Sequence, residues 1–192
     1  MRATDAAVLI PIRSFDDAKT RLSGVLTPAD RTRLAKAMAE RVVHAAHGLP
    51  VHVVSDDPEV GRWATGVGAD VIAPGVSGLN ASVTAAVSTV ASVADPPQRV
   101  IIAHADLPLA EDLRVVTGPG VAIAPDGPRD GSNVLSLPTG AAFTFHYGPG
   151  SFAAHRTEAA ERGLDFTVVV EPGLALDVDE PADLIRLQQE GT

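Results

Sequence analysis

The sequence predicts a single α/β domain built around a mostly parallel sheet. Short runs of β-branched and small apolar residues, such as residues 100–103, recur along the chain and are typical of strands buried on both faces. Segments with helical periodicity and recognisable caps alternate with these runs, as in α/β proteins. The length of 192 residues fits one domain, and a hydrophobic content of 45% suffices for a core.

The predicted strands are bounded by loops rich in Gly, Pro and Asp, which interrupt regular structure. We expect strands at residues 8–12, 51–55, 70–73, 100–103, 121–124, 132–137 and 166–170.

The predicted helices begin at residues that satisfy free backbone N–H groups. Thr27 precedes a proline at the first helical position, and Gly48 ends this helix. Asp57, also followed by proline, indicates a short second helix. We expect the later helices at residues 81–93, with Asn80 as the cap, at 152–162, and after residue 180.

Composition excludes several classes of protein. The formal charge of −9 argues against non-specific binding to nucleic acid or to an anionic membrane. The chain has no cysteine, so thiolate catalysis, disulfides and Cys-ligated metal centres are excluded. No apolar run approaches the roughly 20 residues that span a bilayer, and no signal pattern opens the chain, so we expect a cytoplasmic protein.

Asp106 marks the expected centre of the molecule. It follows the buried run 100–103 directly, and ligands of open α/β sheets bind beyond the carboxyl ends of the strands. A carboxylate at this position is well placed to hold a divalent metal that carries a phosphate. The alternative is that Asp106 only caps a turn.

A basic loop follows the first predicted strand. It contains Arg13, Lys19 and Arg21, at the place where a triphosphate lies in many α/β folds. Lys19 stands out because the chain otherwise uses arginine almost everywhere, and a compact ammonium suits a single phosphate oxygen. The alternative is a solvated surface loop.

Two glycine-containing loops lead into predicted helices. The loop with Gly78 and Asn80 can admit a nucleotide against its backbone. Gly148 allows backbone amides to approach an anion, and Ser151 either caps the following helix or donates its hydroxyl. Either loop can equally be an ordinary connection to a helix.

A second acidic group lies near the end of the chain. Asp177 and Asp179 alternate on an extended segment, so their side chains point to the same side. If that side faces Asp106, the three carboxylates can hold one or two magnesium ions. Otherwise Asp179 is only the cap of the last helix.

Taken in order, these pieces resemble the guanylyltransferases of coenzyme F420 biosynthesis, the 2-phospho-L-lactate or phosphoenolpyruvate guanylyltransferase family. The motifs that carry the resemblance span nearly the whole chain: residues 11–13, 18–22, 78–80, 106–108, 131–132, 147–151 and 177–184. The resemblance implies a Rossmann-like, glycosyltransferase-A-like nucleotidyltransferase fold, with a mixed, mostly parallel sheet and helices on both faces.

The resemblance also implies an activity and the residues that carry it. Such enzymes transfer GMP from GTP to the phosphate of a three-carbon acid and release pyrophosphate. Carried over by motif, Asp106, Asp177 and Asp179 hold Mg²⁺, and Lys19 with Arg13 and Arg21 faces the triphosphate. Gly78 and Asn80 belong to the nucleotide site, and the acceptor is contacted by Ser132, Gly148 and Ser151. Lys19 and Asp106 are the expected catalytic residues.

Two other classes of function stay open on the sequence alone. Sugar-nucleotide or molybdopterin-cofactor transferases share the fold, but their Gly-rich first loop is missing between Arg13 and Lys19. A non-catalytic nucleotide-binding module would be expected to lose Lys19, Asp106 or Asp177, and all three are present. We expect phosphoenolpyruvate as the acceptor, then 2-phospho-L-lactate, then 3-phosphoglycerate. A homodimer is one assembly we consider, with no nucleic-acid or membrane partner.

Overall fold

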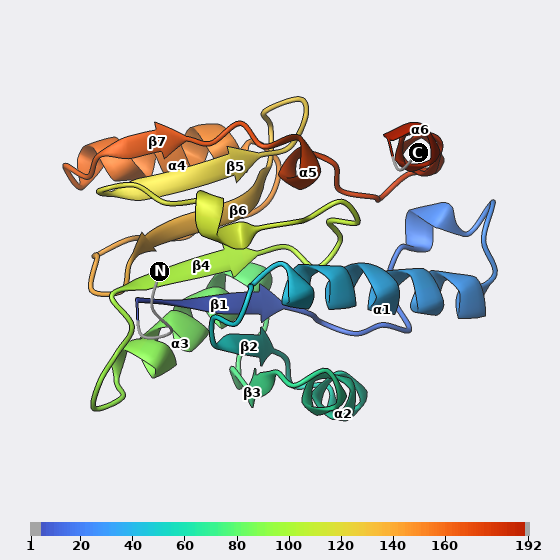
Figure 1. The fold of residues 1–192 in the computed structure, drawn as a ribbon, viewed down its shortest axis with the longest axis horizontal. Coiled ribbons are helices and arrows are strands. Elements are labelled where there is room, and N and C mark those ends of the chain that lie inside the picture. The colour runs from blue at the N-terminus through green and yellow to red at the C-terminus, as the bar shows by residue number, and fades with distance from the viewer. Residues whose placement is uncertain (1–4, 191–192) are drawn as a thin grey trace.

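A computed structural model describes residues 5–190 and contains a seven-stranded sheet with the strand order β3-β2-β1-β4-β6-β5-β7 (Figure 1). Within these residues, β6 runs antiparallel to both of its neighbours, and the other strand pairs are parallel. The predicted mixed, mostly parallel sheet is therefore confirmed. The strands are β1 (Ala6–Pro11), β2 (Val51–Val54), β3 (Asp70–Ile72), β4 (Arg99–Ala103), β5 (Val121–Pro125), β6 (Ser132–Pro138) and β7 (Phe166–Val168).

Helices cover both faces of the sheet, as predicted. Buried residues of α1 and α2 pack with one set of strand side chains, and those of α3 and α4 pack with the other set. Alternate residues of β1 divide between the two sets, with Val8 and Ile10 on one face and Leu9 on the other. Such a strand needs apolar residues at every position, which explains the continuous apolar runs in the sequence. The helices are α1 (Pro28–His44), α2 (Pro58–Gly66), α3 (Leu79–Ala91), α4 (Ser151–Glu161), α5 (Pro172–Ala175) and α6 (Pro181–Glu190), with 3₁₀ turns η1 (Thr20–Leu22) and η2 (Leu113–Val115).

Two of the predicted caps are confirmed, and one is wrong. The Thr27 hydroxyl accepts a hydrogen bond from the Asp30 N–H, and the Asp57 carboxylate accepts one from the Glu59 N–H. Helix α3 instead begins at Leu79 after Gly78, whose φ of 93° lies in the left-handed region, and no side chain caps it. Asn80 lies inside the first turn of α3 because its side chain is bonded to another part of the chain, described below.

The C-terminal segment returns to the N-terminal part of the molecule. Strand β7 is shorter than predicted, and it is followed by α5, a helix that was not predicted. Leu184 and Leu187 of α6 pack against a cluster that contains Leu22 and Met38, so α6 lies beside η1 and α1 (Figure 1). This contact fixes residues 177–179 next to the loop that carries Lys19. No helix of residues 5–190 is both long and apolar enough to cross a membrane.

Candidate active site

Two clefts open where β1, β2 and β4 end. The main cleft has a volume of about 620 Å³ and is lined by Lys19, Asp106, Ser132, Gly148, Ser151, Asp177 and Asp179, among others. The side cleft, of about 700 Å³, lies beyond β1 and β2 and is lined by Arg13, Ser55, Asp56, Gly78 and Ser82, among others. Pro11, Ile12 and Leu79 line both clefts, so the two are continuous around the end of β1. The structure thus brings most of the predicted site residues to the carboxyl edge of the sheet.

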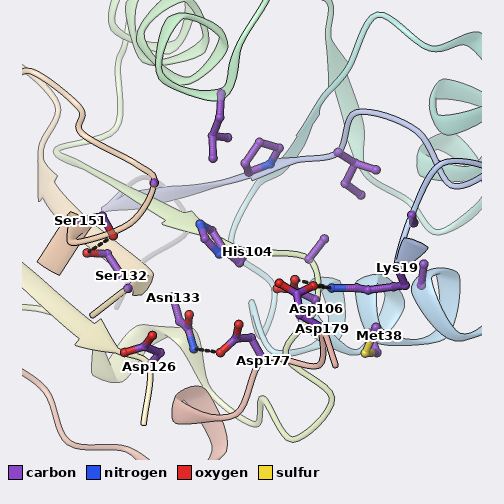
Figure 2. A pocket seen from close by; sticks show the side chains of 18 of the residues that line it. Lys19, Met38, His104, Asp106, Asp126, Ser132, Asn133, Ser151, Asp177 and Asp179 are labelled. Atoms are coloured by element: carbon purple, nitrogen blue, oxygen red, sulfur yellow. Dashed lines mark hydrogen bonds and ion pairs between the residues drawn. The ribbon is translucent and has the colours of Figure 1, made fainter. Parts of the chain in front are cut away.

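Lys19 forms the ionic centre of the main cleft. Its Nζ lies 2.5 Å from Asp106 Oδ2 and 2.8 Å from Asp179 Oδ1, although these residues are far apart in sequence (Figure 2). The backbone of Lys19 is left-handed (φ 56°), and η1 begins at the next residue. This turn directs the Lys19 side chain into the cleft, where it is only 8% exposed.

Lys19 and Asp106 each stabilise the charged form of the other. Burial alone would lower the pKa of Lys19, but the carboxylates of Asp106 and Asp179 outweigh it and raise this pKa above its ordinary value. Burial alone would raise the pKa of Asp106, but the Lys19 ammonium and His104 lower it below its ordinary value. Lys19 is therefore cationic and Asp106 anionic at neutral pH.

Asp177 lies in the same cleft but does not contact Lys19. Its Oδ1 accepts a hydrogen bond of 3.3 Å from Asn133, and burial together with the negative charge of Asp106 raises its pKa. Asp106 Oδ1 is buried and has no hydrogen-bond partner. An unpartnered carboxylate oxygen beside a second carboxylate suits a divalent cation, which takes oxygen ligands. In this arrangement no three His, Cys, Asp or Glu side chains of the described residues are grouped closely enough to hold a metal ion, because Asp106 and Asp179 both face Lys19.

The far end of the main cleft contains hydroxyls rather than ion pairs. Ser132 begins β6 and Ser151 begins α4, and their Oγ atoms lie 3.4 Å apart (Figure 2). Gly148 and Gly150 precede α4 with φ angles of 132° and 73°. Gly150 is the N-cap of α4, so of the two alternatives for Ser151 the cap is wrong, and its hydroxyl donates to Ser132 Oγ instead.

Asn80 joins α3 to the loop before α4. Its Oδ1 accepts a 2.6 Å hydrogen bond from the Tyr147 N–H, and its Nδ2 donates one of 3.1 Å to the Tyr147 carbonyl. Asn80 lines neither cleft, in contrast to Gly78, which lines the side cleft. Its side chain therefore holds the loop that leads to Gly148 and Ser151.

The two predicted arginines lie at the margins of the site. Arg13 is exposed and lines the side cleft. Arg21 lines the main cleft, and its exposed side chain lies 3.6 Å from Glu180. Neither arginine contacts the carboxylates that hold Lys19.

Sequence reasoning missed two side chains that hold the site together. Asn133 donates hydrogen bonds to the Leu174 carbonyl and to Asp177, which fixes the acidic segment to β6. His155 is fully buried in α4 and contacts Ser132. An asparagine in an apolar strand and a histidine on the inner side of a helix were the available signals, but neither pattern identifies its partner.

The sequence matches the family described as "Guanylyl transferase CofC like" over residues 6–192. It is 35% identical to the phosphoenolpyruvate guanylyltransferase of Rubrobacter xylanophilus, over 95% of this chain and 93% of that protein. It is 36% identical to the 2-phospho-L-lactate guanylyltransferase of Methanothermobacter thermautotrophicus, over 96% of this chain and 85% of that protein. The 3-phospho-D-glycerate guanylyltransferase of Phenylobacterium zucineum is 31% identical, over 95% of this chain and 89% of that protein.

Among solved structures, a putative nucleotide-diphospho-sugar transferase from Desulfovibrio desulfuricans superposes with a TM-score of 0.79. It covers 98% of this chain and 88% of the other chain at 13% identity, which shows a shared fold. The predicted nucleotidyltransferase fold is thus confirmed, and the sequence relationships over nearly the full length go further than fold. The chain belongs to the CofC-like guanylyl transferase family and is a nucleotidyltransferase.

Proposed function

We propose that this enzyme transfers GMP from GTP to the phosphate of phosphoenolpyruvate and releases pyrophosphate, as a step of coenzyme F420 biosynthesis. The observation that carries the proposal is the main cleft, where the buried ammonium of Lys19 lies at one end and the hydroxyls of Ser132 and Ser151 lie at the other. A nucleotide phosphate and a second phosphorylated molecule fit these two ends. The names of several relatives support phosphoenolpyruvate as the acceptor.

The reaction needs no nucleophilic side chain. An oxygen of the acceptor phosphate is already anionic at neutral pH, so it can attack the α-phosphorus of GTP without a general base. The new P–O bond forms as the bond from the α-phosphorus to the β-bridging oxygen breaks, and the electron pair leaves with pyrophosphate. The barrier is the approach of two polyanions, so catalysis rests on positioning and on cationic groups. Lys19 supplies a cation that burial keeps from being screened by water.

Lys19 has a further property that suits this task. Its ammonium is held by two carboxylates, so it is kept inside the cleft rather than extended into solvent. Arg21 at the margin of the same cleft is exposed and adds positive charge near the entrance. We propose that Lys19, with Arg13 and Arg21, faces the triphosphate.

We propose Mg²⁺ as the cofactor. Asp106 and Asp177 would hold it, because Asp106 Oδ1 is buried without a partner and Asp177 lies close enough for the charge of Asp106 to raise its pKa. Asp179 is the third candidate ligand, since its carboxylate lies against the same ammonium as Asp106. When bound, the ion neutralises phosphate charge, as divalent cations do in phosphoryl transfer.

We place guanine in the side cleft. Backbone groups around Gly78 and the end of β1 line this cleft, and Arg13 lies at its edge. A site that hydrogen-bonds one base edge rejects other bases because its own groups are then left unpaired. GTP is therefore expected to be preferred over ATP and CTP, and equal use of ATP would contradict this placement.

The test is a coupled measurement of pyrophosphate release and of the guanylylated product. The enzyme is incubated with GTP, Mg²⁺ and one of three acids: phosphoenolpyruvate, 2-phospho-L-lactate or 3-phospho-D-glycerate. We expect the highest kcat/KM with phosphoenolpyruvate, and a product whose mass equals that of the acid plus GMP minus water. A higher kcat/KM with another acid would replace the acceptor, and pyrophosphate release with none of them would overturn the proposed function.

A further inference from the structure

His155 is a fully buried histidine at the acceptor end of the main cleft. It lies in α4, and its side chain has no exposed surface. Its Nδ1 lies 3.0 Å from Ser132 Oγ, and its Nε2 lies 2.9 Å from the backbone nitrogen of His146. The ring therefore connects a cleft-lining hydroxyl with the loop before α4.

The hydrogen bond from His146 decides which ring nitrogen of His155 carries the proton. A backbone N–H can only donate, so Nε2 of His155 must accept and cannot carry a proton. Burial, with the nearby His146 and His104, lowers the pKa of His155 to about 4, although Glu158 acts in the opposite direction. The ring is thus neutral at physiological pH, with its single proton on Nδ1. This N–H points at Ser132 and donates to its oxygen.

The donation from His155 orients the hydroxyl of Ser132. A serine hydroxyl has one proton to donate and two lone pairs that accept. His155 Nδ1–H occupies one lone pair, and the Ser151 hydroxyl at 3.4 Å occupies the second. The Ser132 proton is then left for a group in the main cleft, which Ser132 lines. The opposite tautomer of His155 would take this proton and turn a lone pair toward the cleft.

We propose that His155 is a positioning residue that makes Ser132 a hydrogen-bond donor to the anionic acceptor substrate. Phosphate and carboxylate oxygens of such a substrate accept hydrogen bonds. A hydroxyl proton directed into the cleft therefore strengthens substrate binding, and a lone pair directed there weakens it. The inference rests on the proposed function for the identity of the acceptor. The tautomer of His155 does not depend on the proposed function, because it follows from the hydrogen bonds to His146 and Ser132.

Two substitutions of His155 test the roles of its two ring nitrogens one at a time. In His155→Asn the amide nitrogen takes the place of Nδ1, so donation to Ser132 is kept and the bond from His146 is lost. In His155→Gln the amide lies near the place of Nε2, so the bond from His146 is kept and donation to Ser132 is lost. Both side chains are neutral and both leave part of the ring volume empty, so they form a matched pair.

We expect His155→Gln to raise the KM for phosphoenolpyruvate about tenfold, because a hydrogen bond to a charged group is weakened. His155→Asn should change this KM by less than about threefold, and neither variant should change the KM for GTP. In a Ser132→Ala background, His155→Gln should have no further effect on the acceptor KM, because the two residues act in series. Equal KM increases in Asn and Gln variants, or an undiminished effect in the Ser132→Ala background, would overturn the proposal.

The tautomer can also be measured without any substitution. ¹⁵N chemical shifts of the imidazole in the wild-type protein distinguish a protonated from an unprotonated ring nitrogen. We expect a protonated Nδ1 and an unprotonated Nε2 at neutral pH, and the reverse would overturn the proposal even if both variants failed to fold. If the wild-type enzyme turned over none of the three acids, the proposed function would fail. Calorimetric binding of phosphoenolpyruvate to the two variants would then test the role of His155, with equal affinities contradicting it.

Discussion

The two ends of the main cleft, each of which we propose binds a phosphate, differ in chemistry. At the Lys19 end, a buried ammonium lies between the carboxylates of Asp106 and Asp179. At the Ser132 end, the groups are two hydroxyls and a neutral imidazole. Asp130, which also lines the cleft, accepts a hydrogen bond from the Gly150 N–H. The difference fits the opposite needs of the two phosphates.

A leaving pyrophosphate gains negative charge during transfer, and a cation at the Lys19 end stabilises this charge. The attacking phosphate must stay nucleophilic, and a strong ion pair would stabilise its charge before the reaction. Hydroxyls and backbone N–H groups bind an anion with less loss of reactivity. The comparison therefore predicts that charge changes at the Lys19 end reduce kcat, and that changes at the Ser132 end raise the KM of the acceptor.

The largest effect is expected for Asp106→Asn. This change removes a charge that holds Lys19 and the buried oxygen proposed to bind Mg²⁺. We expect kcat to fall about a thousandfold, ~4 kcal/mol of transition-state stabilisation, with the protein still folded. Asp177→Asn should act similarly, and Asp179→Asn should be milder because its carboxylate is the more exposed partner of Lys19.

Steady-state kinetics and a thermal unfolding curve on each variant make the measurement. Asp95→Asn is the matched control, since Asp95 is an exposed residue in the loop before β4, at the other end of that strand. Turnover close to wild type in Asp106→Asn would remove the ionic end from the mechanism.

Acid should disturb the two ends at different pH values. The pKa of His155 is about 4 in the folded protein and near 6.5 when unfolded, so only the unfolded chain binds this proton between those values. The stability that His155 provides is complete above pH 6.5 and is lost as the pH falls toward 4, on the order of 3 kcal/mol. The pKa of Asp106 is lowered below 3.8, so its contribution is lost only in more acidic solution.

Urea unfolding at a series of pH values between 7 and 4 tests this difference in wild type and in His155→Gln. We expect a smaller loss of unfolding free energy in the variant over this interval, because its side chain does not titrate. His52, whose pKa is also lowered by burial, adds a part that is common to both proteins. The same pH dependence in both proteins would contradict a neutral His155 at the acceptor end.

Removal of the hydroxyls should weaken acceptor use without a change in nucleotide affinity. We expect Ser132→Ala to raise the acceptor KM by roughly ten- to a hundredfold, since it loses a hydrogen bond to a charged group of about 1.5–3 kcal/mol. Ser151→Ala should raise it less, because the Ser151 hydroxyl donates to Ser132 Oγ and acts on the acceptor through it. Ser136→Ala is the matched control, because Ser136 is buried in the same strand and its hydroxyl has no partner. A raised KM for GTP with a normal acceptor KM would exchange the assignments of the two ends.

The sequence predicted the sheet well because burial on both faces is a local, continuous property of a strand. It also predicted α1 and α2, whose caps are bonded to residues within three positions. Several residues of the main cleft, among them Lys19, Asp106 and Ser132, were predicted because strand ends and glycine loops converge in α/β folds. The hydrogen-bond partners of these residues were not predicted, since Lys19 contacts Asp106 and Asp179, which lie 87 and 160 positions away in the sequence. Such pairs depend on the strand order and on the packing of α6, which no local pattern encodes.

Asn80 shows how the same limit produced an error. A residue of this type before a helical pattern is a good cap by local rules, but here its amide is bonded to Tyr147, 67 positions away. At Tyr147 the Asn80 amide makes two hydrogen bonds, one with the backbone N–H and one with the backbone C=O. As a helix cap, Asn80 would make one hydrogen bond, through its side-chain oxygen. The helix therefore begins two residues earlier than predicted, at Leu79 after Gly78.

The smallest effect is expected for Asn80→Ala, since Asn80 was predicted at the nucleotide site but is bonded to the loop that leads to Gly148 and Ser151. If Asn80 acts as the structure indicates, its loss frees the loop of Tyr147 and Gly148 and raises the acceptor KM about fivefold, ~1 kcal/mol, with the KM for GTP unchanged. If Asn80 contacts the nucleotide, as the sequence alone suggested, the KM for GTP rises instead. Ser88→Ala, on the exposed side of α3, controls for loss of helix stability. Because each hypothesis raises a different KM, titrations of GTP and of the acceptor decide whether Asn80 belongs to the nucleotide end or to the acceptor end.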